Sequence, residues 1–406
     1  MAHPKATEAL TKLKGAAAPF ILFTNGSGVA ESVRASNLST ALSHPISPNQ
    51  LLQSHLPFKL RAKDYKTVLV VGGKGEDCRL IAEEYGFKDV FIPEDFYAAD
   101  PTISPFSTSP PPAHAKEIPK DTKIDAIFVF SDPRDWPLSI QVIIDTMLSN
   151  NGEVGTHWDQ EVVGHHVPLY FSNPDLLWEN TYPLPRLGQG AFQRALWGAY
   201  TGYRTEWYKT PNYRPALLGK PGPVVFRIAE RMVTECLGGE GSENGLSLED
   251  WPLGGATSAV NPWKVSGEDK EVPVKVEQAI AGKGYEKGVE RIYMIGDNPR
   301  SDILGTNIFQ SGRGIEWISI LVKSGLYKGG NHHGAPRAIV DDVSAAVDWA
   351  FENERRIENN EPLEKGPYHI AAAKRLEAPG KRQNHLGAEP DEGPKEPKGS
   401  RKSKVG

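Results

Sequence analysis

The chain has little cysteine: only Cys78 and Cys236 occur among its 406 residues. Two cysteines cannot build the disulfide framework of a small secreted domain, so the composition gives no sign of an oxidising compartment. No apolar run approaches the ~20 residues that a membrane-spanning helix needs, and we expect no membrane insertion. The first residues lack the basic region and long apolar stretch of a secretory signal, so we expect an intracellular protein.

Positive charge is also in short supply. The 46 lysines and arginines are outnumbered by 51 acidic residues, which gives a net charge of −5. Binding to nucleic acid generally needs a basic face that neutralises phosphates, and we therefore expect no nucleic-acid partner. The length is enough for about two or three domains of roughly 150 residues, each with its own core.

Short apolar runs alternate with helical patterns along the chain. Near-continuous apolar runs are typical of strands buried on both faces of a parallel sheet. The predicted strands lie within residues 19–26, 66–73, 126–132, 168–173, 291–297 and 317–322. The predicted helices cover residues 7–14, 138–148, 191–200, 224–237 and 343–353. This alternation indicates an α/β protein with parallel sheets.

Three segments are rich in the residues of loops and disorder. Residues 101–119 and 238–272 predict surface loops or insertions, because proline, glycine and serine dominate them. From about Glu361 the chain has too little apolar surface to offset the entropy of ordering, which predicts a disordered C-terminal tail.

The strongest local signal is residues 296–302, Gly-Asp-Asn-Pro-Arg-Ser-Asp, directly after a predicted strand. Asp297 stands at the strand end, and Asp302 follows at the start of a helix. Mg²⁺ prefers one or two carboxylates together with water and phosphate oxygens, so this pair could hold a divalent cation. An aspartate that caps the following helix is an equally good interpretation.

Two further segments have the composition of phosphate-binding loops. Residues 23–28, Phe-Thr-Asn-Gly-Ser-Gly, place a hydroxyl, an amide and glycine backbone N–H groups after a strand. An ordinary strand–turn–helix corner has the same composition. Lys220, between two turn residues, could balance phosphate charge or simply be solvated. Composition alone does not show whether residues 23–28 or Lys220 bind phosphate.

The order of these segments resembles that of the haloacid dehalogenase-like (HAD) phosphohydrolases. A strand ending in Thr-Asn-Gly, a long insertion, Gly-Lys-Pro and then Gly-Asp-Asn-x-x-x-Asp is similar to subfamily IIA, which carries a large α/β cap. Finer matches resemble the branch of cat-eye-syndrome critical-region protein 5, and together they extend from about Pro4 to Asn353. They lie at residues 69–73, 131–136, 170–178, 183–190 and 321–328.

This resemblance implies roles for the phosphate loop and the lysine. Thr24 would hydrogen-bond the transferring phosphoryl group, assisted by Asn25 and Gly26. Lys220 would neutralise the phosphoryl group and an attacking carboxylate. In that family an aspartate attacks phosphorus and a second aspartate is the general acid and base.

The resemblance also implies a cofactor and a substrate class. Asp297 would ligate Mg²⁺ and Asp302 would orient that metal site. Asn173 and Asp175 would come from the cap and face a small phosphorylated molecule. A homodimer through the cap and a mitochondrial location are further expectations by resemblance, with the cytoplasm as the other compartment.

The family's first motif, Asp-x-Asp on the first core strand, is missing ahead of the helix at residues 7–14. We therefore expect a Rossmann-like core without its first strand, and no catalysis in this form. The strands ending at Thr24 and Asp297 would be left with unpaired backbone groups or forced together. Two explanations stay open: a truncated form of a longer hydrolase, which we favour, or a pseudoenzyme that uses the cap and phosphate cradle for binding.

The resulting predicted organisation has four parts. Residues 1–45 form the first part of the core and residues 46–205 the cap. Residues 206–355 complete the core, and residues 356–406 form the disordered tail.

Overall fold

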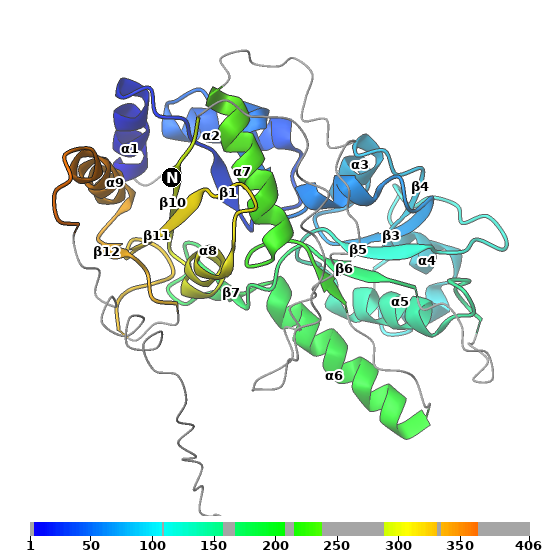
Figure 1. Cartoon of the computed structure of the whole chain (residues 1–406). Coiled ribbons are helices and arrows are strands. Elements are labelled where there is room, and N and C mark those ends of the chain that lie inside the picture. The colour runs from blue at the N-terminus through cyan, green and yellow to red at the C-terminus, as the bar shows by residue number, and fades with distance from the viewer. Residues whose placement is uncertain are drawn as a thin grey trace, which may run out of the picture. The chain divides into compact units, whose positions relative to one another are not determined.

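The computed structural model describes residues 4–107, 109–156, 167–207, 215–237, 288–330 and 334–363. The predicted loop at 238–272 lies outside the described residues, as does most of the predicted tail. Within the described part, helices and parallel strands alternate along the chain, as the sequence predicts (Figure 1).

The strands are short and fall into three parallel groups and one hairpin. The first group is β1 (Leu22–Thr24) and β2 (Leu51–Gln53). The second is β3 (Thr67–Val71), β4 (Asp89–Phe91), β5 (Ala126–Val129), β6 (Leu169–Phe171) and β9 (Ala216–Leu217). The third is β10 (Arg291–Gly296), β11 (Glu316–Val322) and β12 (Ala338–Val340). The antiparallel hairpin joins β7 (Leu177–Trp178) and β8 (Arg186–Leu187).

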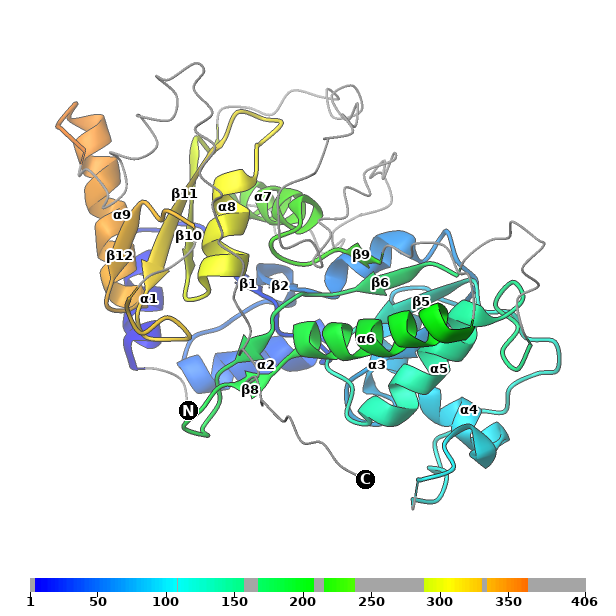
Figure 2. The same ribbon diagram turned by 90° about the horizontal axis from the view of Figure 1, so that it is seen from below.

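The helices cover these sheets on both faces (Figure 2). They are α1 (Pro4–Gly15), α2 (Glu31–Leu42), α3 (Asp77–Glu84), α4 (Pro93–Ala99), α5 (Trp136–Leu148), α6 (Gln189–Trp207), α7 (Pro223–Leu237), α8 (Leu304–Ile308) and α9 (Val343–Glu358). Their ends follow ordinary capping rules. Asp135 accepts the Leu138 N–H at the start of α5, and Asp342 accepts the Ala345 N–H at the start of α9. None of the described helices has an apolar stretch long enough to cross a membrane.

The five-stranded sheet has the order β4-β3-β5-β6-β9, and all its neighbours run parallel. Successive residues of its central strands enter different cores. Val68 and Phe128 pack towards α7, whereas Leu69 and Ile127 pack with residues of α5 and α6. Because both faces are covered, these strands are apolar at consecutive positions, and this explains the apolar runs in the sequence.

The strands on either side of the missing first strand, β1 and β10, belong to two separate sheets. Among the described residues, β1 pairs only with β2, and β10 pairs only with β11. Of the two expected outcomes, strands left unpaired or strands forced together, the structure has the first. The fold class is confirmed as α/β with parallel sheets.

Pairing crosses both predicted domain boundaries. β1 pairs with β2 across residue 45, and β6 pairs with β9 across residue 205. The division into core and cap therefore stays a prediction. The predicted start of the tail at 356 is wrong by a few residues, because α9 continues to Glu358. Arg355 and Arg356 pair with Glu352 on the preceding turn, which stabilises this last part of the helix.

A buried histidine next to β2 should make the stability of the fold depend on pH. His55 is fully buried, and its ring lies 5.7 Å from that of Phe130. Neither ring nitrogen has a hydrogen-bond partner among the described residues, and Nε2 lies 3.5 Å from Glu31 Oε1. Burial lowers the pKa of His55 to about 3. Because the folded-state pKa lies below that of the unfolded chain, the neutral ring favours folding above pH 6.5, and this contribution is lost as pH falls.

We expect the wild type to lose about 2 kcal/mol of unfolding free energy from this residue between pH 7 and pH 5. His55→Phe keeps a ring of similar shape and removes the titration, so its stability curve is flatter over that interval. Urea unfolding at several pH values measures the difference. Parallel curves for the two proteins contradict the prediction.

Candidate functional site

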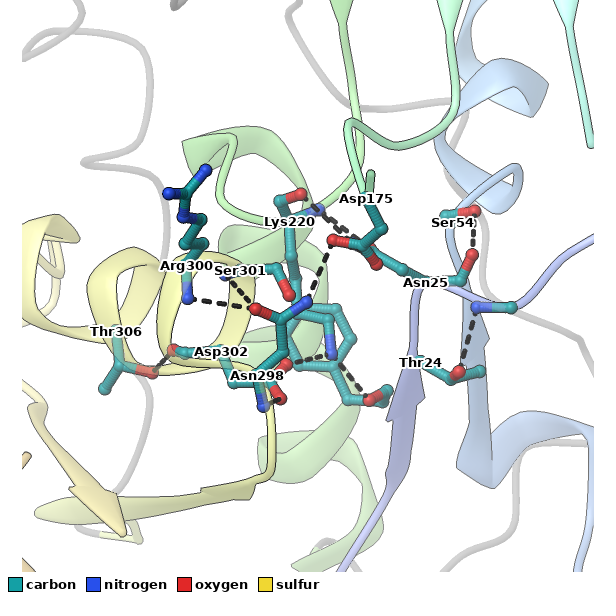
Figure 3. Close-up of polar contacts among 12 residues, drawn as sticks. Thr24, Asn25, Ser54, Asp175, Lys220, Asn298, Arg300, Ser301, Asp302 and Thr306 are labelled. Atoms are coloured by element: carbon teal, nitrogen blue, oxygen red, sulfur yellow. Dashed lines mark hydrogen bonds and ion pairs between the residues drawn. The ribbon is translucent and has the colours of Figure 1, made fainter. Parts of the chain in front are cut away.

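The Lys220 side chain lies at the centre of the candidate site (Figure 3). Only 5% of the side chain is exposed. Its Nζ donates to Asp302 Oδ1 over 2.6 Å and to the Phe23 carbonyl oxygen over 3.0 Å. A buried ion pair persists only where close geometry and further hydrogen bonds offset the desolvation of both charges. Lys220 thereby links the loop after β9 to β1 and to the segment after β10.

The loop after β1 is held by hydrogen bonds at Thr24, Asn25 and Gly26. Thr24 Oγ1 accepts the Gly26 N–H over 2.9 Å. The Asn25 side chain accepts the Lys220 N–H and donates to the Lys220 carbonyl, both over 3.1 Å. The Asn25 carbonyl accepts hydrogen bonds from Ser54 and Asn173. The loop is therefore held in one conformation before any ligand binds.

Asp175 reaches this loop from the segment after β6. Its two carboxylate oxygens accept Asn25 Nδ2 over 3.0 Å and Asn298 Nδ2 over 3.2 Å. Burial raises the pKa of Asp175 to about 6, and the hydrogen bond from Asn25 and the charge of Lys220 partly oppose this shift. Asp175 therefore joins the segments after β1, β6 and β10.

Asn173 connects the β1 loop to Asp175 through hydrogen bonds. Its side chain is buried, donates to the Asn25 carbonyl over 3.1 Å and accepts the Asp175 N–H over 3.1 Å. Gln189, at the start of α6, accepts the Asn173 N–H over 2.9 Å. These contacts hold Asn173 and Asp175 against the β1 loop.

Asp297 and Asp302 follow β10, and each packs on a glycine. A Cβ on Gly296 would lie 2.3 Å from Asp302 Oδ2, and one on Gly325 would lie 2.0 Å from Asp297 Oδ2. Glycine is needed at both positions because the carboxylates occupy the space of a side chain. Burial raises the pKa of Asp297, and the Leu326 N–H bonded to Oδ2 partly offsets this.

The two aspartates differ in what remains available for a cation. Asp302 uses one oxygen for Lys220 and the other for the Asn298 N–H, over 3.0 Å. Asp297 Oδ1 has no hydrogen bond to another of the described residues. The part of the chain that the structure describes contains no group of three acidic, histidine or cysteine side chains that could hold a metal ion. Mg²⁺ can be bound through one carboxylate with water and phosphate, and the geometry fits that arrangement with Asp297 as the ligand.

The structure corrects one interpretation of this motif. The residue that caps the helical turn Pro299–Ile303 is Asn298, whose Oδ1 accepts the Arg300 N–H over 3.0 Å. Asp297, the alternative cap, instead points to the Leu326 backbone. The capping interpretation of the aspartates is therefore wrong.

The predicted site residues come together, and two unpredicted residues join them. Asn298 contacts Asp175 and Asp302, and Ser54 Oγ donates to the Asn25 carbonyl over 2.9 Å. Asn298 belongs to the motif at residues 296–302, so the sequence could have identified it as a site residue. Ser54 follows the short strand β2, and nothing in the local sequence marks it.

Comparison with known proteins identifies relatives along most of the chain. A family described as haloacid dehalogenase-like hydrolase matches residues 1–88, and one described as HAD-hydrolase-like matches residues 270–346. A mitochondrial hydrolase of Saccharomyces cerevisiae is 33% identical over 354 residues, which are 86% of this chain and 90% of the yeast protein.

A second relative is a fusion protein of Schizosaccharomyces pombe, named a cardiolipin synthase (CMP-forming) and mitochondrial hydrolase. It is 32% identical over 337 residues, so this chain spans about half (47%) of its length. A solved structure of a hypothetical protein from Pyrococcus horikoshii has a TM-score of 0.49 at 16% identity and covers 86% of this chain and 93% of its own. Family membership therefore rests on the sequence relatives.

The buried ion pair gives a testable prediction for stability. Lys220→Met removes the cation and leaves Asp302 buried without its charged partner, which is expected to cost about 3–5 kcal/mol of unfolding free energy. Adding Asp302→Asn to this variant removes the uncompensated charge, so the double variant is destabilised by less than the sum of the single changes. Urea unfolding at pH 7 measures all three.

Lys328 supplies the matched control. It pairs with Glu179 over 3.3 Å, but 63% of its side chain is exposed. An exposed pair contributes at most about 1 kcal/mol, so Lys328→Met should unfold nearly like the wild type. Equal losses for Lys220→Met and Lys328→Met would contradict the structural importance of Lys220.

Proposed function

The chain belongs to subfamily IIA of the haloacid dehalogenase-like hydrolases, and we propose that the residues around Lys220 are the phosphate-recognition part of a Mg²⁺-dependent phosphomonoester hydrolase site. The observation that carries the proposal is a single hydrogen-bonded network at the carboxyl ends of β1, β6, β9 and β10. Ligands of parallel α/β sheets bind at that edge.

Lys220 and Thr24 are the groups that we assign to the phosphoryl oxygens. An ammonium has three N–H donors, and Lys220 uses one for Asp302 and one for the Phe23 carbonyl. Nζ also lies 4.6 Å from the centre of the Phe23 ring, and we assign its remaining N–H to a phosphate oxygen. The Thr24 hydroxyl accepts from Gly26 and still has its own hydrogen to donate. Asn25 and Gly26 hold the threonine in place.

We assign Mg²⁺ to Asp297, with Asp302 as the residue that orients the site through Lys220 and Asn298. A bound divalent cation would supply charge stabilisation for the phosphoryl oxygens. Binding to Asp297 requires the ionised carboxylate, whose formation burial opposes. Cation affinity should therefore rise with pH.

Turnover is a separate question. The family's nucleophile lies in an Asp-x-Asp motif, and the 406 residues contain no two aspartates at that spacing. Asp175 is a poor replacement because both its oxygens accept amide hydrogens inside the network. We propose that the protein is a phosphatase-like hydrolase by family, and that this form of the chain binds phosphorylated molecules without hydrolysing them. The alternative is a pseudoenzyme, in which binding or interaction through the cap and phosphate cradle is the protein's function in place of hydrolysis.

The partners and location are also proposals. A small phosphorylated molecule is the ligand class that fits the network, and the name of the budding-yeast relative supports a mitochondrial location. A homodimer through residues 46–205 remains a prediction.

Phosphate binding can be tested with Thr24→Val, which keeps the shape of the side chain and removes the hydroxyl. Loss of a hydrogen bond to a charged group is worth about 1.5–3 kcal/mol, so we expect at least about tenfold weaker binding of inorganic phosphate in the presence of Mg²⁺. Isothermal titration calorimetry measures the affinity for inorganic phosphate. Thr40→Val on the exposed side of α2 is the control, and equal affinities of the two variants would refute the assignment.

Catalysis can be tested with p-nitrophenyl phosphate and Mg²⁺ on the 406-residue chain. We expect a rate no higher than that of buffer, because no nucleophile is present for a covalent intermediate. Turnover that disappears with Asp297→Asn would show that this form is an active enzyme. Phosphate binding without turnover agrees with the proposal.

A further inference from the structure

The hairpin of β7 and β8 concentrates exposed apolar side chains next to the candidate site. Among the described residues, twelve large apolar side chains are exposed, and five of them lie within residues 176–187, which we call the apolar hairpin. Apolar residues scattered singly over a surface need no explanation, whereas a concentrated patch marks a site of interaction or ligand binding. The five are Leu176, Trp178, Tyr182, Leu184 and Leu187.

The base of the apolar hairpin is joined to the phosphate-loop side of the site. The Gly188 N–H donates to the Leu176 carbonyl over 2.9 Å and closes the hairpin there. The residue before Leu176 is Asp175, whose carboxylate accepts hydrogen bonds from Asn25 and Asn298 (Figure 3). The apolar surface therefore begins one residue away from the network that we assign to phosphate binding.

The apolar hairpin also contacts the loop that holds Asp297. Glu179, directly after β7, pairs with Lys328 over 3.3 Å. Lys328 follows Leu326 and Tyr327, whose backbone N–H groups donate to the carboxylate and the carbonyl of Asp297. The apolar hairpin is therefore tied to the phosphate-loop side of the site at its base and to the cation side through Glu179.

The apolar hairpin has no net charge. It contains one acidic residue, Glu179, and one basic residue, Arg186. Glu179 pairs with Lys328, and the Arg186 guanidinium lies 4.4 Å from the centre of the Tyr182 ring, which is a cation–π contact. A ligand beside this segment therefore gains mainly apolar contact, and the segment has no surplus charge for a second ionic group.

We propose that the ligand of the site is the phosphate monoester of an uncharged, apolar alcohol, and that the apolar hairpin contacts its hydrocarbon part. This inference rests on the proposed phosphate-binding function and names the class of ligand for that site. The phosphoryl group binds at Lys220 and Thr24, and removal of the hydrocarbon from water against the hairpin adds affinity. A second anionic group on the ligand would be repelled by the carboxylates of Asp175 and Asp297.

Four ligands test this assignment: inorganic phosphate, methyl phosphate, hexyl phosphate and glucose 6-phosphate. Each is titrated into the 406-residue chain in the presence of Mg²⁺ by isothermal titration calorimetry. A fully buried methylene strengthens binding about fourfold, so burial of two or three of the five methylenes that distinguish hexyl from methyl phosphate gives about thirtyfold tighter binding. Hexyl phosphate should also bind at least about tenfold more tightly than glucose 6-phosphate, whose six carbons carry hydroxyl groups.

The outcomes separate this inference from the proposed function. Equal affinities for methyl and hexyl phosphate, with inorganic phosphate still bound, overturn the inference and leave the proposed function intact. Binding of none of the four ligands refutes the phosphate site itself, and the inference with it. Inorganic phosphate should displace hexyl phosphate, and hexyl phosphate that it does not displace is bound elsewhere, which also overturns the inference.

A double variant, Leu184→Ser with Leu187→Ser, tests the hairpin directly. These side chains are 62% and 60% exposed, so the fold depends little on them. We expect the ratio of hexyl to methyl phosphate affinity to fall at least about fivefold. Leu80→Ser on α3, where the side chain is 53% exposed, is the matched control, and it should leave this ratio unchanged. Circular dichroism checks that both variants fold, and the ligand series on the wild-type chain decides if the double variant does not.

A second copy of the chain is the competing occupant of the apolar hairpin. Light scattering of the wild type and of the double variant measures the oligomeric state. If the double variant converts a dimer to a monomer while the ratio of hexyl to methyl phosphate affinity stays that of the wild type, the surface is an interface between two copies and the inference is wrong.

Discussion

The buried ammonium of Lys220 is the contact on which the rest of the site depends. It neutralises Asp302, binds the carbonyl of Phe23, and its backbone is held by both ends of the Asn25 amide. One charged group thereby joins segments almost 200 residues apart. Because a charge in the interior is costly without close partners, the loops that provide these partners are constrained to one arrangement.

That constraint gives the site its chemical character. Asp175 and Asp297 are both drawn into the interior, where burial raises the pKa of each carboxyl. Asp302 is satisfied by Lys220 and Asn298, so it organises the site and leaves Asp297 as the carboxylate with an available oxygen. A cluster of acids around one lysine has a surplus of negative charge, which suits a divalent cation and a phosphate bound together.

The strands that carry the site, β1 and β10, are not joined by a common neighbouring strand among the described residues. β1 and β10 carry the site at their carboxyl ends, yet they belong to separate sheets among the described residues. The helices α1, α7 and α9 line the space between them with apolar side chains on both faces.

Much of the fold was predictable because its strands are buried on both faces. Continuous apolar runs located β1, β3, β5, β6, β10 and β11, and helical patterns located α1, α5, α6, α7 and α9. Helix α2 was missed because serine, asparagine and threonine obscure its apolar face. The apolar runs at β2, β4 and β12 are only two or three residues long, whereas the run at β1 extends over Phe20–Phe23. Strands with so little local signal are set by their neighbours in the sheet.

The sequence by itself determined the family, the strand-end motifs and the identity of Thr24, Lys220 and Asp297 as residues to examine. Local order and composition contain that information. Only the tertiary structure decided that Asn298 caps the turn after β10, that Ser54 supports the Asn25 loop, and that β1 and β10 leave a cavity between their edges. These features depend on contacts between segments distant in the chain, and no local pattern specifies which segments meet.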